Sequence, residues 1–184
     1  DLQTGQMLPD QLSWAKFTGL AWQDDGFYYT RYPEPKKGAE LTSVNQFGSV
    51  YFHQIGTPQA KDKLIYSDKA HPNRSFGAGT TEDQRFLYVT GFESTSGNVL
   101  YFKDLTSVKT DFIPIATTFD HDFSVVEHID GKLLVLTNHH APNKRLILVD
   151  PQQPAEQNWQ TLIPEDTSDV LESAVVCGGK ILCN

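Results

Sequence analysis

The chain has 184 residues, of which 39% are hydrophobic and 11% aromatic, a composition that suits a globular protein with a sizeable core. Its net charge of −8 argues against a nucleic-acid-binding or anionic-membrane-binding surface, because both need a basic patch. No stretch approaches the roughly 18 consecutive apolar residues that a spanning helix needs. We therefore expect neither a nucleic-acid partner nor a membrane.

The two ends of the sequence look like cut points within a longer protein. The chain begins at Asp1 without an initiating Met or a signal-peptide pattern, and it ends at Asn184 inside a strand-like pattern. The compartment, cytoplasmic or periplasmic, therefore stays open. Cys177 and Cys183 have a spacing that suits neighbouring strands or one strand face, and we expect two free, partly buried thiols.

A hairpin pattern opens the first structural unit. Apolar residues 20–22 precede the turn Asp24-Asp25-Gly26, and the aromatic run 27–29 follows it. The same pattern returns three times along the chain, at 80–89, 124–136 and 174–182. No segment shows a sustained 3.6-residue apolar period, so helix is expected to be nearly absent.

Two further strand signals repeat with a period of about 48 residues. One begins at residues 50, 100 and 147, and a second begins at 64, 113 and 161. Four short strands per unit match a propeller blade better than a sandwich. The sequence thus predicts an all-β partial β-propeller of about three four-stranded antiparallel blades.

The repeat also sets the expected boundaries. Residues 1–13 would end a preceding blade, with an entering strand and a turn at Gly5, and 167–184 would start a further one. The three blades between them are expected at 14–68, 69–119 and 120–166. Since a closed propeller needs roughly four to eight blades, open edge strands are expected, and with them self-association of the fragment.

Three segments resemble the propeller domain of the prolyl oligopeptidase family. They are Leu8-Pro9-Asp10 with residues 15–22 (AKFTGLAW), residues 137–146 (TNHHAPNKRL), and 162–165 (LIPE) with 169–172 (DVLE). The resemblance extends over essentially the whole chain. It implies a segment of a seven-bladed domain that caps an α/β-hydrolase domain of the same parent chain and excludes large folded proteins.

The same resemblance implies that the parent is a serine endopeptidase that cleaves short peptides after proline. This chain contains no Gly-x-Ser-x-Gly, so it has no nucleophile elbow, and we expect no catalytic residue in it. By similarity to the family, Phe17 would line the pocket for the residue two positions upstream of the cleavage-site proline; packing between blades is the alternative role for this side chain. Phe76 and Thr95 fall near other cleft-facing positions, where this sequence departs from the commoner residues.

The histidines His121, His139 and His140, with Asp122, raise the question of a metal site. Adjacent strand residues point to opposite faces, so His139 and His140 are not expected to share one ion. We interpret His139 and His140 as residues that form hydrogen bonds within a loop. His121 and Asp122 are expected to lie in a connection between two blades. No metal and no cofactor is therefore expected.

The longest connection, 31–49, is expected to be a solvated insertion that projects from one face of a blade. Two alternatives to the gating function remain open. The propeller could be a protein-interaction module without a peptidase domain, or it could belong to a related oligopeptidase that prefers basic residues or to a dipeptidyl peptidase. A downstream Gly-x-Ser-x-Gly segment in the parent gene would separate the first alternative from the gating function.

Overall fold

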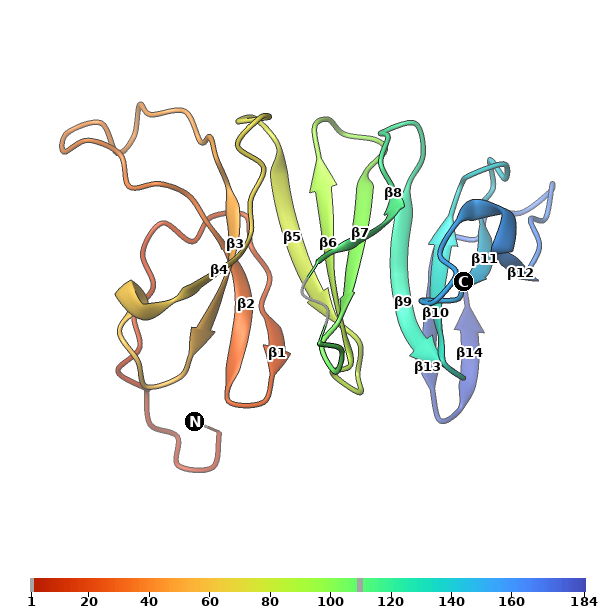
Figure 1. The fold of residues 1–184 in the computed structure, drawn as a ribbon, viewed down its shortest axis with the longest axis horizontal. Coiled ribbons are helices and arrows are strands. Elements are labelled where there is room, and N and C mark those ends of the chain that lie inside the picture. The colour runs from red at the N-terminus through yellow and green to blue at the C-terminus, as the bar shows by residue number, and fades with distance from the viewer. Residues whose placement is uncertain (1, 109–110) are drawn as a thin grey trace. The chain divides into compact units, whose positions relative to one another are not determined.

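The computed structural model describes residues 2–108 and 111–184, and the fold is almost entirely β (Figure 1). Two short 3-10 turns, η1 (Gln59–Lys61) and η2 (Glu156–Asn158), are the helical elements of this described part. No helix there is long and apolar enough to span a membrane. The strands are β1 (Ala21–Gln23), β2 (Gly26–Arg31), β3 (Ser49–Gln54), β4 (Lys63–Tyr66), β5 (Ser75–Thr80), β6 (Phe86–Phe92), β7 (Val99–Asp104), β8 (Ile113–Ala116), β9 (Phe123–Ile129), β10 (Lys132–Thr137), β11 (Arg145–Val149), β12 (Gln160–Ile163), β13 (Ala174–Cys177) and β14 (Lys180–Cys183).

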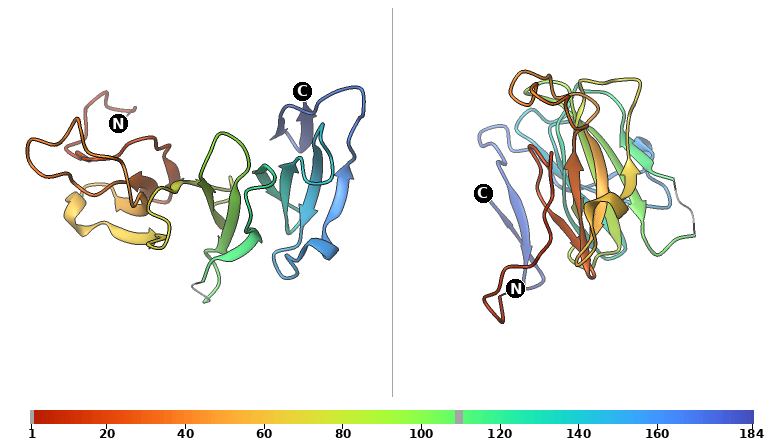
Figure 2. Two further views of the ribbon diagram at one scale, coloured as in Figure 1. Left: turned by 90° about the horizontal axis from the view of Figure 1, so that it is seen from above. Right: turned by 90° about the vertical axis from the view of Figure 1, so that its left-hand side faces the viewer.

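These strands form three four-stranded sheets and one two-stranded sheet. The orders are β1-β2-β3-β4, β5-β6-β7-β8, β9-β10-β11-β12 and β13-β14. Within each sheet, every strand therefore pairs with the strands that precede and follow it in sequence. Figures 1 and 2 show the resulting meanders in three orientations. The prediction of an all-β partial propeller built from four-stranded antiparallel blades is confirmed.

The same irregularity recurs in all three four-stranded sheets. Between the third and fourth strands the register shifts at Val50/Tyr51, at Leu100/Tyr101 and at Leu146/Ile147. A β-bulge of this kind increases the local twist and bends the strand. Its return at equivalent places shows that the 48-residue sequence period corresponds to a structural repeat.

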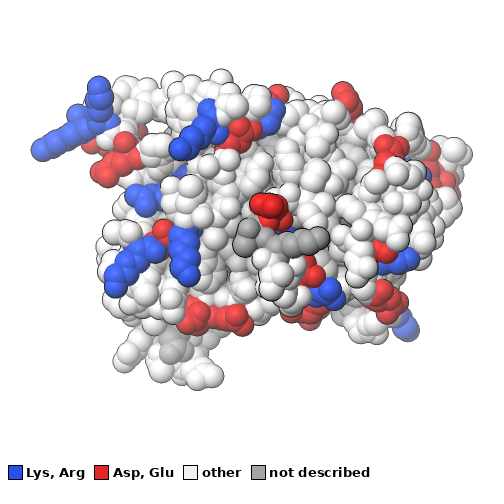
Figure 3. Space-filling model, viewed as in Figure 1, with Lys and Arg blue, Asp and Glu red and all other residues white. Residues whose placement is uncertain are grey.

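The chain divides into two compact units, unit 1 (Asp1–Gly79) and unit 2 (Thr80–Asn184), and the division falls within β5. Unit 1 has eight basic and eight acidic residues, whereas unit 2 has seven and fifteen, so the net charge of −8 lies entirely in unit 2. On the face shown in Figure 3, acidic and basic side chains are interspersed without a continuous basic patch.

The core of unit 2 consists of the inward-facing residues of its strands. Alternating side chains of a strand lie on opposite faces, and Leu134, Leu136 and Leu146 form one buried apolar cluster of this unit. A larger cluster has the buried members Phe86, Leu100, Phe102, Ala116, Phe123, Val125, Leu133, Val135, Ile147 and Val149. Trp159 packs against this cluster, and its Nε1 donates to Pro154 O at 2.9 Å.

The segment before β1 differs from the expectation. Residues 2–20 contain turns and irregular backbone, without the strand predicted to enter within 1–13, and Asp1 lies outside the described residues. Gly5 has φ +67, the left-handed conformation that was predicted for its turn.

The two cysteines lie on neighbouring strands, β13 and β14. Ala174 pairs with Cys183, and Cys177 pairs with Lys180, so the thiols are at opposite ends of the hairpin. Both are free and exposed, so the expectation that they are partly buried is wrong.

Candidate functional site

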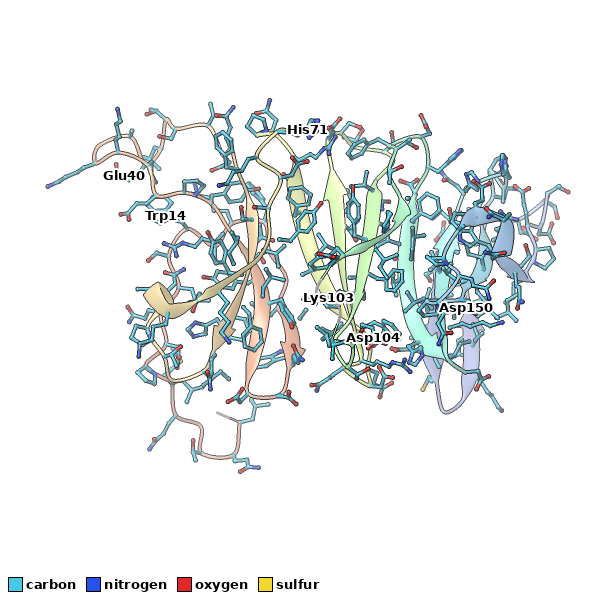
Figure 4. All side chains as sticks on the ribbon, in the orientation of Figure 1. Trp14, Glu40, His71, Lys103, Asp104 and Asp150 are labelled. Carbon is cyan, nitrogen blue, oxygen red and sulfur yellow. The ribbon has the colours of Figure 1, made fainter. Side chains whose placement is uncertain are left out.

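The loop between β2 and β3 folds back beside the segment that precedes β1. Tyr32 N donates to Trp14 O at 3.0 Å, and Lys16 Nζ donates to Asn45 Oδ1 at 3.0 Å. Figure 4 shows Trp14 beside the loop that carries Glu40, and Figure 1 shows this loop projecting from the first sheet. We call this part of unit 1 the loop face and define it by Trp14, Phe17, Tyr32 and Phe47.

The buried side chain of Thr30 holds the loop face to the sheet. Thr30 N donates to Thr18 Oγ1 at 2.7 Å, and Thr30 Oγ1 donates to Phe76 O at 2.7 Å. Strand β1 is only three residues long and ends before it reaches the level of Thr30. The Thr18 hydroxyl therefore accepts the hydrogen bond from Thr30 N that a carbonyl of a longer strand would accept. The backbone next to Phe17 is thereby fixed through Thr30 to the backbone of Phe76.

Phe17 projects into solvent from a strained backbone. Its side chain is exposed (84%), and its φ is 51, in the left-handed region. Trp14 and Phe47 also have positive φ, at 59 and 60. For bulky residues this conformation costs on the order of 1–3 kcal/mol each, and strain of this kind concentrates at functional sites.

Two grooves border the loop face. One of about 510 Å³ is lined by Arg31, Tyr32, Pro33, Phe47, Ser49, Tyr51, Leu64, Ser67, Asp68 and Lys69. A smaller one of about 190 Å³ is lined by Trp14, Lys16 and residues 32–35 and 43–47. Burial would raise the pKa of Asp68, but hydrogen bonds from His71 and Ala70 and the charge of Arg74 hold this pKa below 3.8. The lining of the larger groove therefore includes a charged carboxylate, Asp68, as well as the cationic side chains of Arg31 and Lys69.

The other two predicted site residues lie in different environments. Phe76 is buried on β5 (3% exposed) and packs edge-on against Tyr66, with ring centroids 5.0 Å apart. Thr95 is exposed in the turn between β6 and β7 and belongs to unit 2. Within unit 1, Phe17 is thus the predicted aromatic that reaches solvent, while Phe76 supports it through the Thr30 contact.

A buried charged cluster in unit 1 was not anticipated from the sequence. His53 is fully buried, with Nδ1 2.8 Å from Asp62 Oδ1 and Nε2 3.1 Å from Asp10 Oδ1. Tyr29 donates its hydroxyl proton to Asp62 Oδ2 at 2.6 Å, and Gln59 donates to the Tyr29 oxygen. Burial and the Asp62 contact raise the pKa of Tyr29 to about 12, so its hydroxyl stays protonated.

The protonation of His53 is set by opposing effects. Burial of the imidazole lowers its pKa, but the carboxylates of Asp62 and Asp10 outweigh burial and hold the pKa above 6.5. The pKa of Asp10 is in turn held below 3.8 by the backbone N–H of Gly56 and by His53. The cluster fixes the chain before β1 to β3 and to the turn before β4.

In unit 2, a polar network joins the β6–β7 turn to the start of β9. Asn98 is buried, and its side chain pairs with the Phe123 backbone: Phe123 N donates to Oδ1 at 2.8 Å, and Nδ2 donates to Phe123 O at 3.0 Å. Asp122 accepts from Gly97 N at 2.8 Å and from Asn138 Nδ2 at 3.1 Å. The prediction that Asp122 lies in a connection between blades agrees with this placement between β8 and β9.

His139 and His140 lie in the turn between β10 and β11, and the strand argument does not apply to them. Because His140 has φ 51, both rings turn to the same side, with centroids 4.1 Å apart. His139 Nε2 is 2.7 Å from Glu156 Oε1, and His140 Nε2 is 3.6 Å from the same oxygen. The expectation that the two imidazoles point apart is wrong.

A family comparison accounts for the repeat and the sheet order. The model of the prolyl oligopeptidase N-terminal β-propeller domain matches residues 1–184. The chain belongs to the prolyl oligopeptidase family. Prolyl endopeptidase from Elizabethkingia meningoseptica is 42% identical over 173 residues, which cover 94% of this chain and 24% of that protein.

Solved structures agree with the family assignment. Prolyl oligopeptidase B from Galerina marginata bound to a 25mer macrocyclization substrate has a TM-score of 0.86 and 26% identity, over 96% of this chain and 25% of that one. A prolyl endopeptidase structure has a TM-score of 0.85 and 27% identity, over 98% and 26%. The chain thus spans about a quarter of the length of these relatives, within the propeller of the family.

Proposed function

We propose that this chain is the non-catalytic, substrate-gating propeller segment of a serine-type prolyl endopeptidase that cleaves short peptides after proline. The match of the family's propeller model to residues 1–184 carries this proposal. Relatives named prolyl endopeptidase and the absence of Gly-x-Ser-x-Gly from this sequence support it. Acyl transfer through an activated serine would take place in an α/β-hydrolase domain of the parent chain.

Within this function, the chain would exclude large folded proteins and contact short peptide substrates. Small apolar and proline-containing peptides present little charge to recognise, so an exposed aromatic side chain offers area and a stacking face. Phe17 fits this role because it is held in an unfavourable backbone conformation yet left open to solvent. Thr95, exposed in its turn, is the second proposed contact, whereas Phe76 would act by supporting the Phe17 segment.

A paired assay tests the proposal. A chromogenic substrate with Gly-Pro before the scissile bond is given to the 184-residue chain and to the full-length product of its gene. We expect hydrolysis by the full-length protein alone. If neither hydrolyses the substrate, a protein-interaction module becomes the better interpretation; if the isolated chain hydrolyses it, the proposal is wrong.

Replacing Phe17 with alanine in the full-length protein is expected to lower kcat/KM about tenfold, since an aromatic contact of roughly 1–2 kcal/mol is lost. The loss should be largest for substrates with a bulky apolar residue two positions upstream of the cleavage-site proline. Steady-state kinetics on a substrate series that varies this residue measures the effect.

Two control variants accompany this experiment. Leu41→Ala removes a fully exposed apolar side chain from the neighbouring loop and should leave kcat/KM unchanged. Phe17→Gly should lose the same activity as Phe17→Ala while relieving the positive φ, so its melting temperature should be the higher of the two. Equal kcat/KM for the Phe17→Ala variant and the unmodified protein on every substrate would contradict the assignment.

A further inference from the structure

Unit 2 contains a compact group of metal-ligating side chains outside the loop face. His139, His140 and Glu156 each offer one ligand atom, and these atoms all lie within 4.8 Å of one another. His121 is next to them, with its ring centroid 4.6 Å from that of His139. The three ligands come from two segments, the turn after β10 and the helical turn η2, and His121 lies in the connection before β9.

We propose that His139, His140 and Glu156 form a binding site for a divalent cation of the Zn²⁺ type. Two imidazoles and one carboxylate are a ligand set that zinc accepts, with a further position left for water. This site is independent of the gating function, because it needs neither the loop face nor the catalytic domain.

The spacing of the ligand atoms suits this ion. Zinc takes nitrogen and oxygen ligands at about 2.0–2.2 Å, which in a tetrahedral shell places neighbouring ligand atoms about 3.3–3.6 Å apart. His140 Nε2 and Glu156 Oε1 are 3.6 Å apart. His139 Nε2 lies at hydrogen-bond distance, 2.7 Å, from the same oxygen, so a displacement of less than about 1 Å would bring it into the shell.

The proposed ion takes the position of the hydrogen bond between His139 and Glu156. In the structure Nε2 of His139 is bonded to Glu156, and the other ring nitrogen, Nδ1, is buried without a hydrogen-bond partner among the described residues. The two ring nitrogens point in different directions, so one ion can bind only one of them, and Nε2 is the nitrogen that lies beside Glu156. The neutral imidazole with its lone pair on Nε2 is the form that would bind the metal.

The surroundings hold the cluster in place and favour a cation. The His139 ring packs against Trp159 and Phe123, with centroids 5.6 and 6.0 Å apart, so it is 13% exposed. The net negative charge of unit 2 raises the local concentration of divalent cations.

The test is calorimetric titration of the chelator-treated full-length protein with zinc chloride. The starting protein carries Cys177→Ser and Cys183→Ser, because the two exposed thiols would also bind zinc. We expect saturation at one equivalent and a melting temperature that rises with zinc concentration. His140→Ala and Glu156→Gln should each weaken binding at least about tenfold.

The variants separate a metal site from a structural hydrogen-bond cluster. His140 is 71% exposed, so its loss should not unfold the protein, and Glu156→Gln retains an oxygen acceptor for His139. His71→Ala removes an exposed histidine of unit 1 and should leave zinc binding unchanged. Failure of zinc to saturate any site, or equal affinity in His140→Ala, would show that the cluster is hydrogen-bonded only and overturn the proposal.

Discussion

Replacing Asp62 with asparagine is expected to lower the free energy of opening of β2 and β3 by about 3 kcal/mol, because a buried histidine loses its closest counter-charge. Asp62 and His53 side chains are each 1% exposed, so water cannot replace the lost ion pair. Asparagine keeps the size of the side chain, which leaves the charge as the main difference. Native-state hydrogen exchange of the β2 and β3 amides in the full-length protein measures the loss.

The same cluster makes the stability of unit 1 depend on pH. The folded-state pKa of His53 is above its ordinary value of 6.5, so its contribution is complete below about pH 6.5 and is lost as pH rises through the raised pKa. Asp10 has a folded-state pKa below 3.8, so its contribution is present above about pH 3.8 and is lost as pH falls through the lowered pKa. Unit 1 should therefore be most resistant to opening between these two values.

Asp25→Asn is the matched control for both measurements. Asp25 accepts a hydrogen bond from Gln54 Nε2 at 3.0 Å at an exposed position, where one such contact contributes about 1 kcal/mol or less. In Asp25→Asn, the free energy of opening of unit 1 should still fall as pH rises above 6.5, as in the unmodified protein. In Asp62→Asn, this fall should be much smaller. If Asp62→Asn exchanges like Asp25→Asn, the buried ion pair does not stabilise unit 1.

The strand pattern was predictable because it depends on short-range chemistry. Apolar runs such as Val50-Tyr51-Phe52 alternate with turn residues, and tight turns such as Asp24-Asp25 indicate a hairpin from a few adjacent residues. Strand β5 was harder to predict, since its sequence SFGAGT has one large apolar side chain, Phe76, and two glycines. Its place in the sheet depends on packing rather than on propensity.

The candidate sites were less predictable because their partners are distant in sequence. His53 meets Asp10 across 43 residues, and Glu156 meets His139 across 17, and no local pattern signals either contact. The alternation of side chains along a strand predicts that His139 and His140 point apart, but both residues lie in the turn after β10, where His139 bonds to Glu156 as the loop interpretation predicts. A positive φ at His140 reversed that geometry, and a non-glycine residue gives little sequence signal for it.

Gly97 is a position in unit 2 where we expect a large effect of a single added methyl group. Gly97 has φ +72, and a Cβ built there would lie 1.7 Å from Phe119 O and 2.5 Å from Phe119 C. Both are backbone atoms, so the connection between β8 and β9 would have to move. Gly97→Ala should therefore destabilise unit 2 by about 3 kcal/mol, the sum of left-handed strain and overpacking.

Two glycines of the chain separate these causes. Gly131 has φ +80 with nothing within 4 Å of its Cβ position, so Gly131→Ala should cost only the backbone strain, about 1 kcal/mol. Gly77 has neither a positive φ nor a close neighbour, so alanine there should change stability by about 0.5 kcal/mol or less, or raise it slightly.

Denaturant unfolding of the three variants, with hydrogen exchange at β7 and β9, decides between the causes. A cost for Gly97→Ala equal to that of Gly131→Ala would mean that the Phe119 backbone yields freely. A much larger cost would mean that the connection is rigid. The hydrogen bonds of Asn98 to the Phe123 backbone and of Asp122 to Gly97 favour the rigid outcome, because moving Phe119 would break the network that joins two successive blades of unit 2.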